Sequence, residues 1–217
     1  MRAFEDADLE IGQRQCRQLG ERRLKGRELG YDLSGEGGKS VIGRVTDRVK
    51  ELEARGYSFE AADASFELLL RDELNGRRAH YFTVESWRVI VEQRASGEVT
   101  SEATVKLVVK GERVIAVGEG NGPVNALDKA LRAALEQTFP ELAALSLTDF
   151  KVRILEGSHG TGAITRVLVE STSSSLESKG DSWNTVGVDE NIVAASWHAL
   201  EEAVTYCLLR SGREADA

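Results

Sequence analysis

The hydrophobic pattern of residues 112–117 predicts a strand that leads, through a glycine-rich turn, directly into a helix. Pro123 suits the first position of that helix, because its fixed φ angle is helical and its missing N–H would have had no partner there. The apolar stripe of the helix consists of Leu127, Ala130, Leu131, Ala134 and Leu135. With Asn121 or Gly122 as the cap, the first N–H groups of the helix remain free. Such a helix end attracts an anion, typically a carboxylate or a phosphate.

The same pattern recurs 69 residues later, which indicates an internal repeat. Superposing Gly118 on Gly187 matches strand positions with strand positions and apolar helical positions with apolar helical positions. The matched pairs are Val117 with Val186, Val124 with Val193, Ala126 with Ala195, Ala130 with Ala199, Leu131 with Leu200, and Ala134 with Ala203. Two further strands precede each copy, so we predict two βββα repeats of about 65 residues each. The alternative is chance recurrence of valine-glycine before a helix rich in alanine and leucine.

Periodicity and composition divide the chain into four segments. Residues 1–35 are charged and rich in glycine and are expected to be partly disordered; residues 36–78 form a helical linker subdomain; residues 79–212 carry the two repeats; residues 213–217 form a disordered tail. Strands are expected at 81–92, 101–110, 112–117, 147–155, 163–172 and 183–188, and helices at 125–135 and 191–210. The predicted fold class is α+β, with antiparallel three-stranded units that are each backed by a helix.

The linker subdomain is expected to be a hairpin of two helices. The first runs from about Ser40 to Gly56, and Ser58 is expected to cap the second, which ends at Asn75 before Gly76.

Three strands and one helix leave part of each sheet uncovered, so each repeat should pack on the other or on a second chain. The last helix, with Trp197 and Tyr206, is the predicted surface of a homodimer. A monomer whose two repeats cover each other is the alternative.

The composition is that of a globular protein and excludes several partners. Of 217 residues, 41% are hydrophobic and 29% are charged, with no apolar run long enough to span a membrane and no secretory signal pattern. A cytoplasmic location without a membrane partner is therefore expected. The net charge of −8 opposes nucleic-acid binding, and the basic cluster between Arg14 and Arg27 is interleaved with glutamates and lacks aromatic residues. Cys16 and Cys207 form neither a disulfide framework nor a zinc motif, and Cys207 is expected to be a small buried residue.

The sequence gives no positive case for catalysis. His80, His159 and His198 are neither paired as His-x-His nor spaced for a helical metal site. The glycine-rich turn does not match the dinucleotide fingerprint, because the strands look antiparallel. We therefore expect no cofactor in this chain and no catalysis by the chain alone.

Three segments, Lys50–Leu69, Glu119–Leu131 and Val186–Trp197, carry a resemblance to a known family. They resemble the C-terminal portion of the 2-isopropylmalate, homocitrate and citramalate synthases, with citramalate synthase as the closest subtype, and the resemblance covers about residues 28–210. In that family an N-terminal (β/α)8 barrel condenses acetyl-CoA with a 2-oxo acid at a divalent metal. The C-terminal domain dimerises and binds isoleucine or leucine as a feedback inhibitor.

The resemblance implies the regulatory part of an acyltransferase of isoleucine or leucine biosynthesis. The His-x-His metal motif of the barrel is not in this sequence, so metal and acetyl-CoA are expected only for a catalytic barrel in the same or another chain. Residues 1–27 match nothing recognisable. Two alternatives stay open: a dimerisation or scaffold module without ligand binding, and a free-standing acyltransferase, which the missing metal motif disfavours.

An amino-acid effector needs donors for its carboxylate, an acceptor for its ammonium group and an apolar slot for its side chain. The helix ends after Gly122 and Asp189 can supply donors, and Asp149 or Asp189 can accept from the ammonium group. The candidate effector-binding residues are Asn121, Gly122, Val124, Asp149, Ala163, Thr165, Asp189 and Ile192. The resemblance points most strongly to Ile192, and the choice between isoleucine and leucine stays open.

Overall fold

The protein is described by a computed structural model that covers residues 35–155, 162–176 and 182–215. The described chain forms two compact units: one holds residues 35–54 and 69–78, and the other holds residues 55–68 and the chain from residue 79 onward. The predicted N-terminal segment, except its last residue, lies outside the described residues, as do His159 and the last two residues of the predicted tail.

The first compact unit contains helix α2 (Gly35–Ala54) and the second half of helix α3 (Asp63–Asn75). Val49 of α2 and Leu70 of α3 are both buried. Arg44 of α2 donates to the carboxylate of Glu73 at 3.1 Å and to the carbonyl oxygen of the same residue at 2.8 Å. These contacts join two amphipathic helices, as the sequence predicts.

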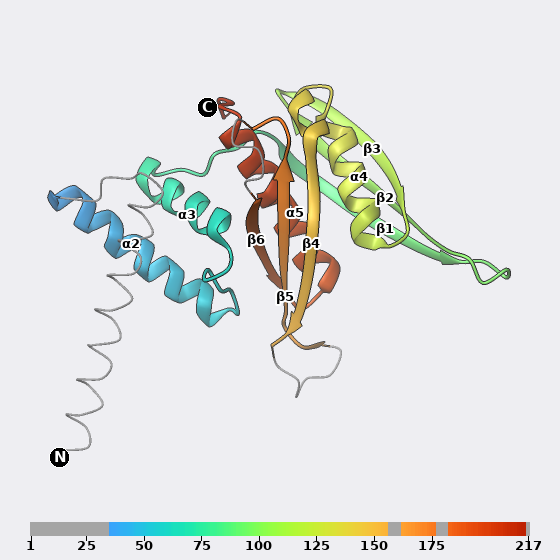
Figure 1. Ribbon diagram of the computed structural model, residues 1–217, viewed down its shortest axis with the longest axis horizontal. Coiled ribbons are helices and arrows are strands. Elements are labelled where there is room, and N and C mark those ends of the chain that lie inside the picture. Colours follow the sequence, from blue (N-terminus) through green and yellow to red (C-terminus); the bar gives the residue numbers. More distant parts are fainter. Residues whose placement is uncertain (1–34, 156–161, 177–181, 216–217) are drawn as a thin grey trace, which may run out of the picture. The chain divides into compact units, whose positions relative to one another are not determined.

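The second compact unit contains the two predicted βββα repeats, and the α+β fold class is confirmed. Each repeat has an antiparallel sheet, in the order β1-β2-β3 or β4-β5-β6, with a helix on one face (Figure 1). The elements are β1 (Thr83–Gln93), β2 (Val99–Val109), β3 (Glu112–Gly120), α4 (Pro123–Leu135), the 3₁₀ helix η1 (Pro140–Ala144), β4 (Leu145–Ile154), β5 (Thr165–Ser173), β6 (Ser182–Asp189) and α5 (Ile192–Arg210).

Each helix approaches its own sheet closely at a glycine in the last strand of its repeat. A Cβ atom built on Gly118 would lie 2.5 Å from the carbonyl oxygen of Ala126, and one built on Gly187 would lie 1.9 Å from that of Ala195. The glycines and the alanines opposite them are the residues that the 69-residue offset matches. The repeat in the sequence therefore reflects a requirement for small residues where helix and strand meet.

The first strand of each repeat carries a β-bulge at an equivalent place. The register shifts around Glu85 in β1 and around Thr148 in β4. A bulge changes the alternation of side chains by one residue, so Leu147 and Phe150 share the face that packs toward the helices. Trp87, two residues after the first bulge, occupies the position in β1 that Phe150 occupies in β4.

A shared core joins the two repeats through the last helix. Trp197 of α5 stacks on Trp87 of β1 with ring centroids 5.9 Å apart, and Tyr206 packs on Trp183 at 5.7 Å. Trp197 and Tyr206 are 3% and 2% exposed, so the prediction that they form a dimer surface is wrong. Both rings are buried against other residues of the same chain. Cys207 is fully buried, as predicted, and burial raises its pKa to about 11.

The start of α3 closes the free edge of the second sheet. The side chain of Asp63 accepts the backbone N–H of Asn184 at 3.0 Å, and the hydroxyl of Ser65 accepts that of Val186 at 2.9 Å. These bonds satisfy N–H groups of the edge strand β6 that have no strand partner.

Helix α3 begins four residues later than the sequence predicts, at Asp63 instead of directly after Ser58. The segment before it is irregular, because Arg166 of β5 donates to the carbonyl oxygens of Gly56 and Tyr57. A side chain of strand β5 thus binds these two carbonyl groups, and helix α3 begins only after the chain has passed this strand.

Candidate ligand pocket

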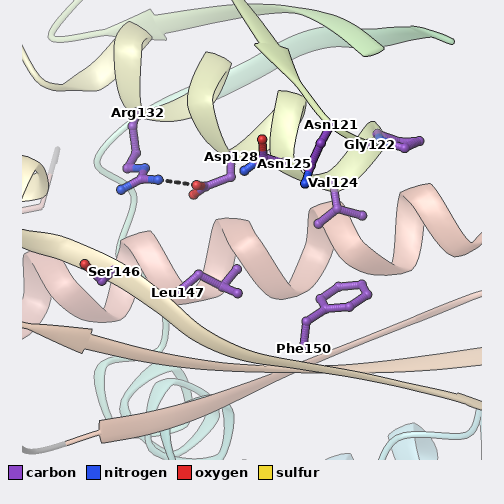
Figure 2. A pocket seen from close by; sticks show the side chains of 10 residues that line it. Asn121, Gly122, Val124, Asn125, Asp128, Arg132, Ser146, Leu147 and Phe150 are labelled. Atoms are coloured by element: carbon purple, nitrogen blue, oxygen red, sulfur yellow. Dashed lines mark hydrogen bonds and ion pairs between the residues drawn. The ribbon is translucent and has the colours of Figure 1, made fainter. Parts of the chain in front are cut away.

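A cavity of about 470 Å³ lies between the beginning of α4 and strand β4 (Figure 2). This volume falls within the range of about 300–1,000 Å³ that is typical of small-molecule sites. The cavity is lined by Asn121, Gly122, Pro123, Val124, Asn125, Asp128, Arg132, Ser146, Leu147 and Phe150. All of these residues come from the end of the first repeat and the start of the second.

The cavity has an apolar and a polar part. Val124 of α4 points toward Phe150, with Leu147 beside them on β4, and the side chains of Asp128 and Arg132 lie toward the other end (Figure 2). The bulge in β4 puts Leu147 and Phe150 on the same face, so the apolar floor depends on it.

The two repeat helices differ in how their N-termini are capped. Helix α5 is capped by Asn191, whose side chain accepts the N–H groups of Val193 at 2.8 Å and Ala194 at 3.3 Å. Helix α4 has Gly122 at the same position and no side-chain cap. The first N–H groups of α4 therefore keep their capacity to bind an anion, and Gly122 borders the cavity.

Asp128 and Arg132 form a buried ion pair in the wall of the cavity. Their side chains are 11% and 24% exposed, and Arg132 also donates to the carbonyl oxygen of Leu145 at 2.7 Å. Burial raises the pKa of the Asp128 carboxyl, while the neighbouring Arg132 acts in the opposite direction. A further cation, such as an ammonium group, would favour the charged carboxylate.

The cavity exists because the two repeats differ at one helical position. The 69-residue offset places Asp128 where the second repeat has Trp197. In that repeat the indole ring of Trp197 packs against Trp87, whereas here the shorter side chain of Asp128 points toward Arg132 and leaves the space between α4 and β4 unfilled (Figure 2).

Three of the eight predicted site residues, Asn121, Gly122 and Val124, line this cavity together. Asp149 does not: it borders a separate hollow with Glu60 and Glu170. Its carboxylate binds Lys151 at 2.6 Å, and this contact lowers the pKa of Asp149.

The other four predicted residues lie at one end of the second sheet and do not line the cavity. Thr165 pairs with Asp189 across β5 and β6, and its hydroxyl donates to the carbonyl oxygen of Ala163 at 3.4 Å. The carboxylate of Asp189 accepts the N–H of Asn191 at 2.8 Å, and Ile192 is 48% exposed.

Sequence reasoning did not assign seven lining residues to the site: Pro123, Asn125, Asp128, Arg132, Ser146, Leu147 and Phe150. One signal was available, because Asp128 interrupts the match between the repeats at a position where the other copy has a large aromatic residue. The residues of β4 carried no such signal, since only the packing of α4 on the second repeat brings them near.

The described residues show neither a metal centre nor a membrane helix. No group of three or more histidine, cysteine, aspartate or glutamate side chains there is arranged to hold a metal ion. No described helix combines the length and the apolar character needed to cross a bilayer.

Comparison with known proteins agrees with this architecture. The family model described as the LeuA allosteric (dimerisation) domain matches residues 60–208. An (R)-citramalate synthase of Streptomyces coelicolor is 60% identical over 189 residues, which are 87% of this chain and 34% of that protein. An (R)-citramalate synthase of Aquifex aeolicus is 45% identical over 172 residues, or 79% and 31% of the two chains. A 2-isopropylmalate synthase of Aquifex aeolicus is 31% identical over 201 residues, or 92% and 34%.

The chain spans about a third of the length of these curated relatives. The family match covers all of α3 and the two repeats except the last two residues of α5, and it includes every residue that lines the cavity. On the extent of this match, the chain belongs to the LeuA allosteric (dimerisation) domain family.

Proposed function

We propose that the chain is the regulatory, dimerising part of an acyltransferase of the citramalate or 2-isopropylmalate synthase type, and that its cavity binds a branched-chain amino acid as feedback effector. Isoleucine and leucine are the two candidates. The single observation that carries the proposal is the cavity at Asp128, where the second repeat is filled by Trp197. A protein that served only as a scaffold would be more stable if a large side chain filled the space at both equivalent positions.

The walls of the cavity complement the three parts of such a ligand. The free N-terminus of α4 at Gly122 suits a carboxylate. Asp128 suits an ammonium group, a role that the sequence alone assigned to Asp149 or Asp189. Val124, Leu147 and Phe150 suit a branched apolar side chain.

The regulatory role depends on a catalytic partner. The relatives are named as synthases and the chain spans only about a third of their length, so a catalytic barrel in the same or another chain is part of the proposal. Ligand occupancy would act on that barrel by favouring one of two arrangements of the homodimer.

Isothermal titration of the purified chain with isoleucine, leucine, valine and pyruvate tests the proposal. We expect saturable binding of one branched-chain amino acid and no binding of pyruvate, which lacks an ammonium group. The variant Asp128→Trp copies the second repeat and should abolish binding while the chain stays folded by circular dichroism.

The matched control is Asp149→Asn, which changes a carboxylate in the separate hollow and should leave binding unchanged. Absence of heat with all three amino acids from a folded chain would contradict the effector role and favour the scaffold alternative. Loss of binding in Asp149→Asn but not in Asp128→Trp would indicate that the ligand binds outside the cavity.

A further inference from the structure

We propose that the outer face of the sheet β1-β2-β3, the face opposite α4, is a contact surface between two copies of this chain. The inference rests on the homodimer of the proposed function and adds the surface through which the copies meet. It does not involve the ligand cavity.

The outer face presents branched apolar side chains that nothing in the described chain covers. Ile90, Ile115 and Val117 are 52%, 53% and 54% exposed, whereas Val105 and Leu107 beneath α4 are fully buried. The strand register places Ile115 beside Lys106, Val117 beside Thr104, and Ile90 beside Glu102. Adjacent β-branched residues on a sheet face are typical of a surface that packs against a partner.

The second repeat shows how such a face is used when a partner is present. Val186 is the repeat equivalent of Val117, yet Val186 is 1% exposed. It lies beneath the segment around residues 55–68, where Ser65 accepts its N–H and Gly56 approaches the neighbouring Val188. The described chain supplies no corresponding segment for the first repeat, which leaves Val117 for another molecule.

The charges on the outer face are separated along the strands. Arg88 and Lys106 lie toward one end, where Arg113 is paired with Glu85, and Glu102 and Glu119 lie toward the other, where Glu92 is paired with Arg94. Glu102 stands directly opposite Glu119 in the register, an arrangement of like charges that costs stability. Neither carboxylate forms an ion pair within the described part of the chain, so cations from outside would relieve this repulsion.

This pattern makes the face complementary to itself. A two-fold axis in the plane of contact and perpendicular to the strands places the basic end of one copy over the acidic end of the other, as a symmetric dimer requires. A hollow of about 570 Å³, bordered by Ile90, Glu92, Glu102 and Glu119 among others, gives room at the acidic end for a basic side chain of the second copy.

Sedimentation velocity of the full chain over a range of concentrations tests the contact. We expect Lys106→Glu and Glu102→Lys each to raise the dimer Kd by about tenfold or more, because each leaves like charges facing across the two-fold axis. The double reversal Lys106→Glu with Glu102→Lys restores opposite charges and should return the Kd toward that of the unchanged chain. Val117→Lys, at the apolar centre, should also weaken association.

Val152→Lys is the matched control, because Val152 is a 41% exposed valine on the other sheet. Dissociation in Val152→Lys alone, or a dimer that withstands Val117→Lys and both single reversals, would overturn the inference and leave the homodimer intact. A chain that is monomeric at every concentration would instead overturn the proposed homodimer itself. Circular dichroism of each variant separates weakened association from unfolding.

Discussion

At the scale of single residues, Gly187 shows why the repeat in the sequence is so well preserved at particular positions. Helix α5 crosses β6 so closely that the carbonyl oxygen of Ala195 and the backbone nitrogen of Ala199 would lie 1.9 Å and 2.8 Å from an added Cβ atom. Both neighbours are backbone atoms, which cannot rotate away as a side-chain tip can. A methyl group at this position would therefore have to push the helix from the sheet.

Gly187→Ala is accordingly expected to lower the free energy of unfolding by about 1–3 kcal/mol or more, as overpacked cores do. Urea denaturation followed by tryptophan fluorescence measures the change. Gly162→Ala is the matched control, because no atom lies within 4 Å of an added Cβ there and its φ angle is ordinary. Equal stability of the two variants would show that the contact is looser than described.

At the scale of elements, the two repeat helices have the same packing but different caps. Asn191 caps the N-terminus of α5 with its side chain, while the N-cap residue of α4 is Gly122, which has no side chain to do so. Both repeats therefore have the helix that the core requires, but they differ in the cap at its N-terminus, which in α4 borders the cavity.

Asn191→Ala should lower the free energy of unfolding by about 1 kcal/mol, because two N–H groups lose their acceptor. Thermal unfolding measures the loss, and ligand binding at the cavity should not change. Glu190→Ala, one residue earlier, serves as the control. An unchanged melting temperature for Asn191→Ala would mean that water replaces the cap at no cost.

The C-terminal end of α5 is held to η1 by a bidentate ion pair. Arg213, which the sequence places in a disordered tail, donates to both carboxylate oxygens of Glu141 at 2.5 Å and 2.8 Å. This hydrogen bonding is the main reason why the pKa of Glu141 lies below its ordinary value of 4.5. Because the folded state lowers this pKa, the pair stabilises the fold above pH 4.5 and loses that contribution as the pH falls through the folded pKa.

Arg213→Ala should therefore melt at a lower temperature than the unchanged chain at pH 7, and the difference should shrink as the pH falls below 4.5. Melting curves between pH 7 and pH 3 measure it. Arg94→Ala, which removes ion pairs between largely exposed side chains, should change little at any pH. A difference for Arg213→Ala that does not depend on pH would assign its effect to packing on Phe139 instead.

At the scale of the second compact unit, the two repeats are joined by aromatic packing as well as by the chain. The ring of Trp197, from the helix of the second repeat, lies within 5.9 Å of Trp87, from the first strand of the first repeat, with an angle of 29° between the rings. Neither repeat could bury these rings alone, so the repeats are expected to unfold together.

Trp197→Ala should lower the free energy of unfolding by about 3–5 kcal/mol, since it opens a cavity between the repeats. The near-ultraviolet circular dichroism signal of the stacked indoles should also disappear. His198→Ala changes an exposed residue of the same helix and should stay within about 0.5 kcal/mol of the unchanged chain. Two separate unfolding transitions in Trp197→Ala would confirm that this stack couples the repeats.

Most of the second compact unit was predictable, because its elements follow from local periodicity. The strand ends and the two helices lie within a few residues of the predicted ranges, and Pro123 occupies the first position of α4 as expected. The start of α3 was not predictable, because it depends on bonds from Arg166, a residue 110 positions away from Gly56. The burial of Trp197 and Tyr206 was missed for the same reason: an apolar stripe does not reveal whether its partner is in the same chain.

The sequence by itself determined the βββα repeat and the free helix end at Gly122, because each depends on residues that are neighbours along the chain or one repeat apart. Only the tertiary structure decided the cavity, since its floor comes from β4 and its ceiling from α4. The packing of one repeat on the other brings these elements together, and the difference between Asp128 and Trp197 then determines which of two equivalent spaces is filled.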